Sequence, residues 1–213
     1  MEENQQQSTK WHELFGTLLK YLLSPVGLFV STDFSVMSKS PEVDVLILRR
    51  SEAKWTAEQQ ALLPDGIRDC QQSDILLEFK YTESFNEEAL QQALGYDFFY
   101  KQHHSNPKDV QTFVLSAQKP QQQTFRQFGY EGTEHQGVYR SQSWLARKIV
   151  LLSLNELSNE PHNAFVKCFA SRQKEKQNAF NTLKSMGLNA FTTQLQWFIA
   201  GLIPYCFPQK ERI

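Results

Sequence analysis

The sequence predicts a mixed α/β domain in which a central sheet is flanked by helices. Two segments, EVDVLILRR (42–50) and DILLEFKY (74–81), are dense runs of aliphatic and aromatic residues of strand length. Apolar side chains occur on both faces of each segment, which is typical of strands that are covered on both sides. Apolar residues at helical spacing occur before the first segment and after the second. An order of helix, strands, helix, strands and helices predicts a mixed α/β or α+β sheet fold.

The first helix is expected over residues 9–23, with Ser8 or Thr9 as its N-terminal cap. VGLFVS (26–31) follows as a short strand, and the polar residues 1–8 are expected to form a disordered tail. One apolar stripe runs along the helix and consists of Trp11, Leu14, Phe15, Leu18, Leu19 and Leu22.

The second half of the predicted core follows the DILLEFKY strand. Residues 86–104 are expected to form a helix, VQTFVLSA (110–117) a third central strand, and 137–157 one or two further strands. Together these elements define a core domain over residues 9–160. Residues 161–213 are predicted to be a helical extension that either packs on the core or forms a dimer contact.

The bulk composition is that of a globular protein, with 40% hydrophobic and 21% charged residues. No apolar run approaches the roughly 20 residues that span a bilayer, and the polar N-terminus lacks a signal region, so we expect a cytoplasmic protein with no membrane partner. The net charge of −1 means that DNA binding requires a local basic patch. A basic stretch at 139–176 is one candidate, although a solvated helix face accounts for it equally well.

Ionisable residues interrupt the two central strands. Glu78 and Lys80 are two residues apart, so in a strand their side chains share one face, about 7 Å apart along the chain. If the two strands pair, Asp44 is expected beside Glu78. Two converging carboxylates repel each other and a buried carboxylate is costly, and a divalent cation removes both objections.

Magnesium suits this set of ligands because it prefers hard oxygen donors and retains waters and phosphate oxygens in its other positions. Asp44, Glu78 and the main-chain carbonyl of Phe79 are the expected ligands of Mg²⁺, with Mn²⁺ as a substitute. Lys80 is expected to orient the attacking water or to stabilise the negative charge that develops on phosphate.

Asp44 followed by the triplet Glu78-Phe79-Lys80 resembles the PD-(D/E)xK nuclease superfamily, and within it a bacterial branch similar to the recombination-promoting nucleases. The core of that superfamily consists of a helix, three strands, a helix and a strand, which is the order expected over residues 9–117. The resemblance implies a restriction-endonuclease-like fold and Mg²⁺-dependent hydrolysis of phosphodiester bonds. It also implies metal-binding roles for Asp44 and Glu78 and a catalytic role for Lys80.

Three further assignments concern residues near this motif. Pro64-Asp65 precedes Glu78 at a spacing that the superfamily accepts, but the residues after it are turn-like, so we assign the role to Asp44 instead of Asp65. Glu13 lies opposite the apolar stripe of the first helix and is expected to face solvent, while His12 is interpreted as a structural histidine.

Gln92 is the residue of the 86–104 helix that we expect to assist catalysis near the phosphate. It shares a helix face with Glu88 and Tyr96, each four residues away. A solvated polar stripe accounts for the same spacing.

Two functions are therefore considered. The first is a metal-dependent endonuclease whose expected substrate is DNA, with RNA as the second choice, and which is expected to act as a homodimer if it cuts both strands. The second is a catalytically inactive nucleic-acid-binding or protein-interaction module on a nuclease-like fold. The near-neutral charge and the apolar stripe of the C-terminal helix favour the second.

Overall fold

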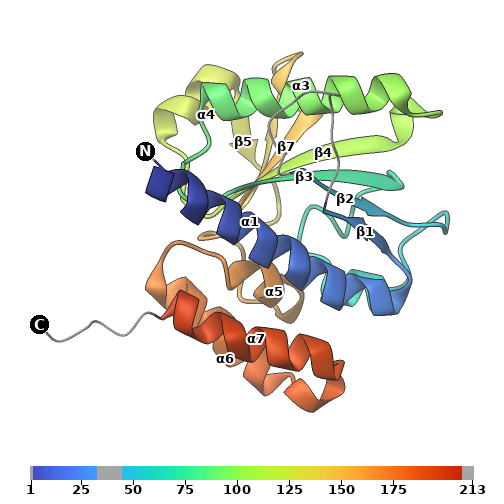
Figure 1. The fold of residues 1–213 in the computed structure, drawn as a ribbon. Coiled ribbons are helices and arrows are strands. Elements are labelled where there is room, and N and C mark those ends of the chain that lie inside the picture. The colour runs from blue at the N-terminus through green and yellow to red at the C-terminus, as the bar shows by residue number, and fades with distance from the viewer. Residues whose placement is uncertain (1, 33–44, 208–213) are drawn as a thin grey trace, which may run out of the picture.

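The centre of the described chain is a seven-stranded mixed sheet (Figure 1). The computed structural model describes residues 2–32 and 45–207. The strands lie in the order β1-β2-β3-β4-β7-β6-β5. They are Phe29–Ser31 (β1), Val45–Arg49 (β2), Asp74–Lys80 (β3), Val110–Ser116 (β4), Tyr130–Gly132 (β5), Val138–Ser141 (β6) and Ile149–Ser153 (β7). The predicted mixed α/β fold is confirmed.

Helices cover both faces of this sheet, with α3 on one face and α1 and α5 on the other, and α6 and α7 lie outside α1 and α5 (Figure 1). The α-helices are Glu2–Leu23 (α1), Ala57–Leu62 (α2), Glu87–His103 (α3), Gln122–Phe128 (α4), Ala164–Lys167 (α5), Gln173–Ser185 (α6) and Thr193–Cys206 (α7). Short 3-10 helices occupy Ser24–Val26 (η1), Pro107–Asp109 (η2), Ala146–Lys148 (η3), Pro161–Asn163 (η4) and Leu188–Ala190 (η5).

Three neighbouring strands of the sheet are parallel, so their carboxyl ends lie at the same edge. β1, β2 and β3 pair in antiparallel fashion, whereas β3 pairs parallel with β4, and β4 parallel with β7. Their register aligns Lys80 with Ser116, and Ser116 with Ser153. The carboxyl ends of β3, β4 and β7 therefore meet at one edge of the sheet, with the end of β3 carrying Lys80.

The first helix is longer than the sequence predicts. It begins at Glu2, so residues 2–8 are helical, whereas the sequence predicts a tail over residues 1–8. The residues before Ser8 are mostly Glu and Gln, which are good helix formers. Acidic side chains at the start of a helix also stabilise it by interacting with the positive end of the helix dipole. A cap at Ser8 or Thr9 is therefore not needed.

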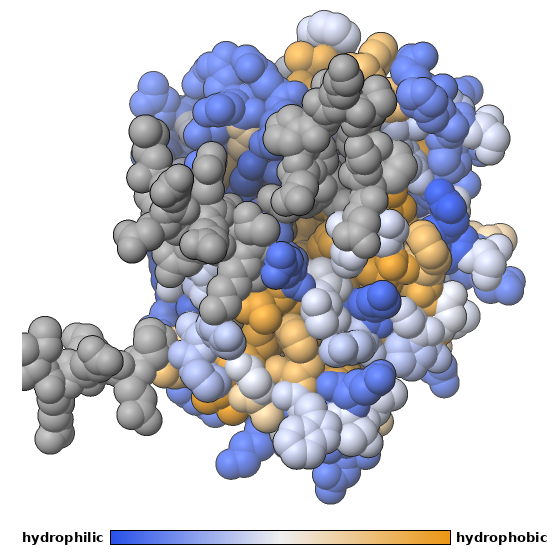
Figure 2. Space-filling model, in the orientation of Figure 1, coloured by the Kyte–Doolittle hydropathy of each residue, from blue (hydrophilic) through white to orange (hydrophobic). Residues whose placement is uncertain are grey.

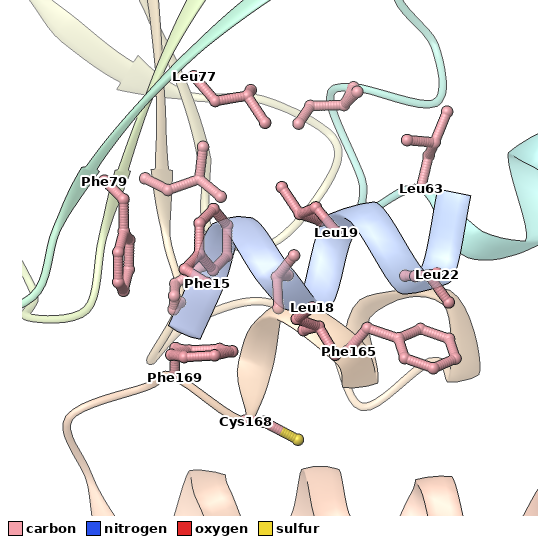
Figure 3. Close-up of a cluster of buried hydrophobic side chains, with 14 of the residues drawn as sticks. Phe15, Leu18, Leu19, Leu22, Leu63, Leu77, Phe79, Phe165, Cys168 and Phe169 are labelled. Atoms are coloured by element: carbon pink, nitrogen blue, oxygen red, sulfur yellow. The ribbon is translucent and has the colours of Figure 1, made fainter. Parts of the chain in front are cut away.

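The main core lies between the sheet and α1 (Figure 3). Phe15 of α1 stacks on Phe79 of β3 with ring centroids 4.4 Å apart. The labelled side chains of this cluster are Phe15, Leu18, Leu19, Leu22, Leu63, Leu77, Phe79, Phe165, Cys168 and Phe169. The predicted apolar stripe of the first helix is thus the surface that α1 buries against the sheet.

The C-terminal helices belong to the same core. Leu183 of α6, together with Leu195 and Ile199 of α7, is buried in the cluster that contains Phe15 and Phe79. Residues 161–207 of the predicted helical extension therefore pack on the core, and the predicted dimer contact remains a prediction. The opposite face of the sheet has a separate core, where α3 covers β4 and β7.

Asp74 joins three elements at the amino end of β3. It is 1% exposed, and its carboxylate accepts hydrogen bonds from Arg49 of β2 at 2.8 Å and from the Tyr100 hydroxyl of α3. His104 Nε2 lies 3.0 Å from the same carboxylate. Burial by itself raises the pKa of Asp74, but the hydrogen bonds from Arg49 and Tyr100 outweigh burial and hold the pKa below its ordinary value.

We expect the substitution Asp74→Asn to lower the free energy of unfolding by about 1–3 kcal/mol at pH 7, because a buried charged acceptor is lost. A depressed pKa in the folded state means that this stabilisation is fully present above the unfolded pKa of about 3.9 and is lost as pH falls through the folded pKa. The difference between wild type and variant should therefore shrink in acid.

Urea unfolding of both proteins, from pH 7 down to the lowest pH at which wild type remains folded, measures this difference. The exposed Glu52→Gln serves as a control and should show almost no effect at any pH. A stability difference that is independent of pH would contradict the role assigned to the Asp74 carboxylate.

Candidate active site

Glu78 and Lys80 lie together at the carboxyl end of β3. The Lys80 ammonium is 2.9 Å from Glu78 Oε1, and the two side chains are 14% and 2% exposed. Glu78 pairs with Val114, and Val114 is buried in the core under α3, so Glu78 faces that helix. Lys80, two residues further along the strand, faces the same helix. The predicted sharing of one strand face by Glu78 and Lys80 is observed.

Gln92 of α3 completes this cluster. Lys80 Nζ donates a hydrogen bond to Gln92 Oε1 at 2.7 Å, and Gln92 Nε2 donates to the Tyr96 hydroxyl one helical turn further on. Asn86 caps the start of α3, because its Oδ1 accepts a hydrogen bond from Ala89 N at 2.9 Å. A helix that starts at this point carries Gln92 over the end of β3. Of the polar stripe expected on this helix, Gln92 contacts Lys80 and Tyr96 contacts Gln92, whereas Glu88 is exposed.

The ammonium of Lys80 retains donor capacity. An ammonium has three N–H donors. Within the part of the chain that the structure describes, Glu78 and Gln92 are its two acceptors. A third donor is therefore available for a water molecule or a phosphate oxygen.

Asp44, the predicted second carboxylate, lies outside the described residues. Val45, where β2 begins, is paired with Glu78. Leu46 is two residues after Asp44, so in a regular strand the two side chains would share one face. Leu46 is buried in the core on the α1 side, whereas Glu78 faces α3. An ion shared by Asp44 and Glu78 therefore requires that regular strand alternation does not extend from Leu46 back to Asp44.

Phe79, the third expected metal ligand, has a fully buried side chain in the α1 core. Its main-chain carbonyl remains a predicted ligand. Among residues 2–32 and 45–207, no group of three or more His, Cys, Asp and Glu side chains is arranged to hold a metal ion.

The sequence predicts no catalytic role for Glu13 or His12 of α1. Glu13 is exposed, as predicted. The His12 ring lies edge-on to Phe79 with centroids 5.5 Å apart, and burial together with the charge of Lys80 lowers the pKa of His12 to about 4. His12 is therefore neutral at pH 7 and lies within the field of Lys80. The helical wheel did not reveal this proximity, because it depends on how α1 crosses the end of β3.

Asp65 belongs to a different cluster. Residues 65–69 form a turn in which Gly66 has a φ of 84°, which confirms the turn predicted from Pro64-Asp65-Gly66. Asp65 is 5% exposed and accepts hydrogen bonds from Asn163 Nδ2 at 2.8 Å and from His162 Nε2 at 2.7 Å. Burial raises its pKa, but these two hydrogen bonds outweigh burial, so the pKa of Asp65 is lowered. Asp65 therefore ties its turn to η4.

Comparison of the chain with protein-family models, with curated proteins and with solved structures finds no match. In the described segments, every helix is too short or too polar to cross a lipid bilayer. The resemblance to nucleases therefore depends on the motif and on the order of elements in this chain.

We expect the ion pair of Glu78 and Lys80 to show a coupling energy on the order of 1 kcal/mol or more in a double-mutant cycle. Removing either partner leaves the other charge largely buried, whereas removing both does not. Urea unfolding of wild type, Glu78→Gln, Lys80→Met and the double variant gives this energy.

The matched control is the cycle of Glu156→Gln and Lys119→Met. These side chains are 20% and 49% exposed and form a 2.6 Å ion pair, which solvent screens more strongly. Equal coupling in the two cycles would show that burial adds nothing to the Glu78–Lys80 pair.

Proposed function

We propose that the chain is a metal-dependent endonuclease that hydrolyses phosphodiester bonds in DNA. The observation that carries this proposal is the buried carboxylate of Glu78 held against the Lys80 ammonium, which Gln92 in turn orients. The elements α1, β1, β2, β3, α3 and β4 occur in the order of the PD-(D/E)xK core, with the short α2 added before β3.

The donor chemistry of this sheet edge fits a hard cation. Glu78 presents a carboxylate that is almost fully buried, and the first described residue of β2 is aligned with it. Glu78, together with Asp44 and the Phe79 carbonyl, would hold Mg²⁺ or Mn²⁺. When bound, such an ion lowers the pKa of a bound water and neutralises charge on phosphate.

The residues of this chain supply positioning and charge. Lys80 directs its remaining N–H at the attacking water or at a phosphate oxygen, where charge develops in the transition state. Gln92 restrains the ammonium through a 2.7 Å hydrogen bond, and Tyr96 restrains the Gln92 amide. A restrained donor needs less rearrangement during the reaction than a flexible surface lysine does.

A second candidate function, a protein-interaction module, is favoured by α7. Trp197, Ile203 and Tyr205 of this helix are 75%, 47% and 43% exposed, and its sequence contains no charged residue. Figure 2 shows hydrophobic surface gathered near the middle of the face that carries α1, with hydrophilic residues around it. Clusters of large exposed apolar side chains mark interaction surfaces. An interaction module is distinguished from a nuclease because it does not cleave DNA.

We expect purified protein to cleave DNA only when Mg²⁺ or Mn²⁺ is present, and Lys80→Ala to reduce the rate by on the order of a hundredfold or more. The loss follows from removing the donor directed at the reacting phosphate. Gel analysis of supercoiled plasmid over time measures the rate, and circular dichroism checks the fold of each variant. Lys20→Ala, at an exposed lysine of α1, is the control and should cleave like wild type. Equal cleavage by Lys80→Ala would remove the role proposed for Lys80.

We expect Mn²⁺ to raise the melting temperature of wild type, because a ligand that binds only the folded state stabilises it by about 2.7 kcal/mol at a hundred times its dissociation constant. The increment should disappear in Asp44→Asn and in Glu78→Gln. Asp65→Asn should retain it, although its melting temperature without metal falls. Loss of the increment in Asp65→Asn, but not in Asp44→Asn, would transfer the aspartate role to Asp65.

A further inference from the structure

The start of α6 lies near the main chain at the carboxyl end of β3, on the α1 side of the sheet, whereas the Glu78 and Lys80 side chains at that strand end face α3. Ala117 N donates to the Lys80 carbonyl at 2.8 Å, and Ser171 N donates to the Ala117 carbonyl at 3.0 Å. Ser171 is thus two hydrogen-bonded steps from Lys80, which corresponds to about 10 Å at the usual spacing of neighbouring strands. In Figure 1, α6 begins on the side of the molecule where β3 ends and α3 begins.

Two uncompensated positive charges occur at this point. Arg172 and Lys174 are both exposed, and within residues 2–32 and 45–207 neither forms an ion pair. The adjacent acid, Glu175, is neutralised by the buried Lys167 at 2.8 Å. The Arg172 amide is held by Asn155 Oδ1 at 3.0 Å, so the backbone that carries the pair is fixed to the loop after β7.

A buried cation of α6 links this helix to the residue that follows β3. Lys176 is 6% exposed, and its ammonium donates to the Tyr81 hydroxyl at 3.1 Å. It also lies 5.7 Å from the centroid of the Trp11 ring, which stacks on Tyr81. Because Tyr81 directly follows Lys80, these contacts hold α6 in place beside the end of β3.

The other side of the site has the opposite charge. Glu83, in the loop after β3, and Glu87 and Glu88, in the first turn of α3, are all exposed. Glu87 accepts hydrogen bonds only from neutral amides among the described contacts, those of Gln91 and Gln127. Exposed acids therefore gather before and at the first turn of α3, and exposed cations gather at the start of α6.

We propose that Arg172 and Lys174 bind the phosphate backbone of duplex DNA and place one strand at the Glu78–Lys80 site. This inference rests on the proposed nuclease function and names the surface by which the substrate approaches. Arginine and lysine contacts to phosphate position a protein on DNA without reading its sequence. Binding through these side chains therefore depends on salt and not on base sequence.

Fluorescence anisotropy of a labelled DNA duplex tests the proposal, with EDTA present so that binding is measured without cleavage. At 0.1 M salt, Arg172→Ala combined with Lys174→Ala should weaken binding by on the order of tenfold per side chain. The slope of log affinity against log salt concentration should fall by about 2. Both side chains are exposed, so the variant is expected to fold, and its melting temperature checks this.

The matched control is Arg147→Ala combined with Lys148→Ala. It removes the same two charges from η3, which directly precedes β7 and so lies at the opposite edge of the parallel strands. Affinity and salt slope that change in the α6 variant, and not in this control, support the proposal. Equal effects in the two variants, or no binding by wild type, overturn it. Binding that depends on Arg172 and Lys174 in a protein that never cleaves DNA supports this surface and removes the nuclease function alone.

Discussion

The buried ion pair of Glu78 and Lys80 is the constraint on which the candidate site depends. A carboxylate that is 2% exposed is costly unless a cation accompanies it, and Lys80 supplies that cation from two residues along the same strand. Among the described residues, Glu78 is the carboxylate that lies within ion-pair distance of the Lys80 ammonium. Its position is then refined by Gln92, which reaches it from the helix that covers that face of the sheet.

The buried carboxylates at the two ends of β3 have different surroundings. Asp74, at the amino end, is surrounded by Arg49, Tyr100 and His104, and these partners lower its pKa and lock β2 and α3 to the strand. Glu78, at the carboxyl end, lies where three parallel strands end together and where the start of α6 approaches. The first arrangement joins β2, β3 and α3 through hydrogen bonds within the chain. The second lies at the carboxyl ends of parallel strands, which is where open α/β sheets commonly bind their ligands.

The tertiary structure determines which basic residues lie near the candidate site. The basic stretch at 139–176 is one run in the sequence, but the fold places Arg147 and Lys148 at the amino end of β7 and Arg172 at the other edge. Lys167 and Lys176 of the same stretch are buried and already have partners inside the protein. A net charge near zero is thus compatible with a local positive surface near the carboxyl end of β3.

The sequence by itself determined the features that arise from local periodicity. Alternation in β3 put Glu78 and Lys80 on one face, and helical spacing put Gln92 and Tyr96 together, because both patterns depend only on residues a few positions apart. Tertiary structure decided everything that joins distant segments. Asp65 meets His162, and Ser171 meets the end of β4, through folding of the chain between them. No local pattern records such contacts, because they depend on strand order and on how helices cross the sheet.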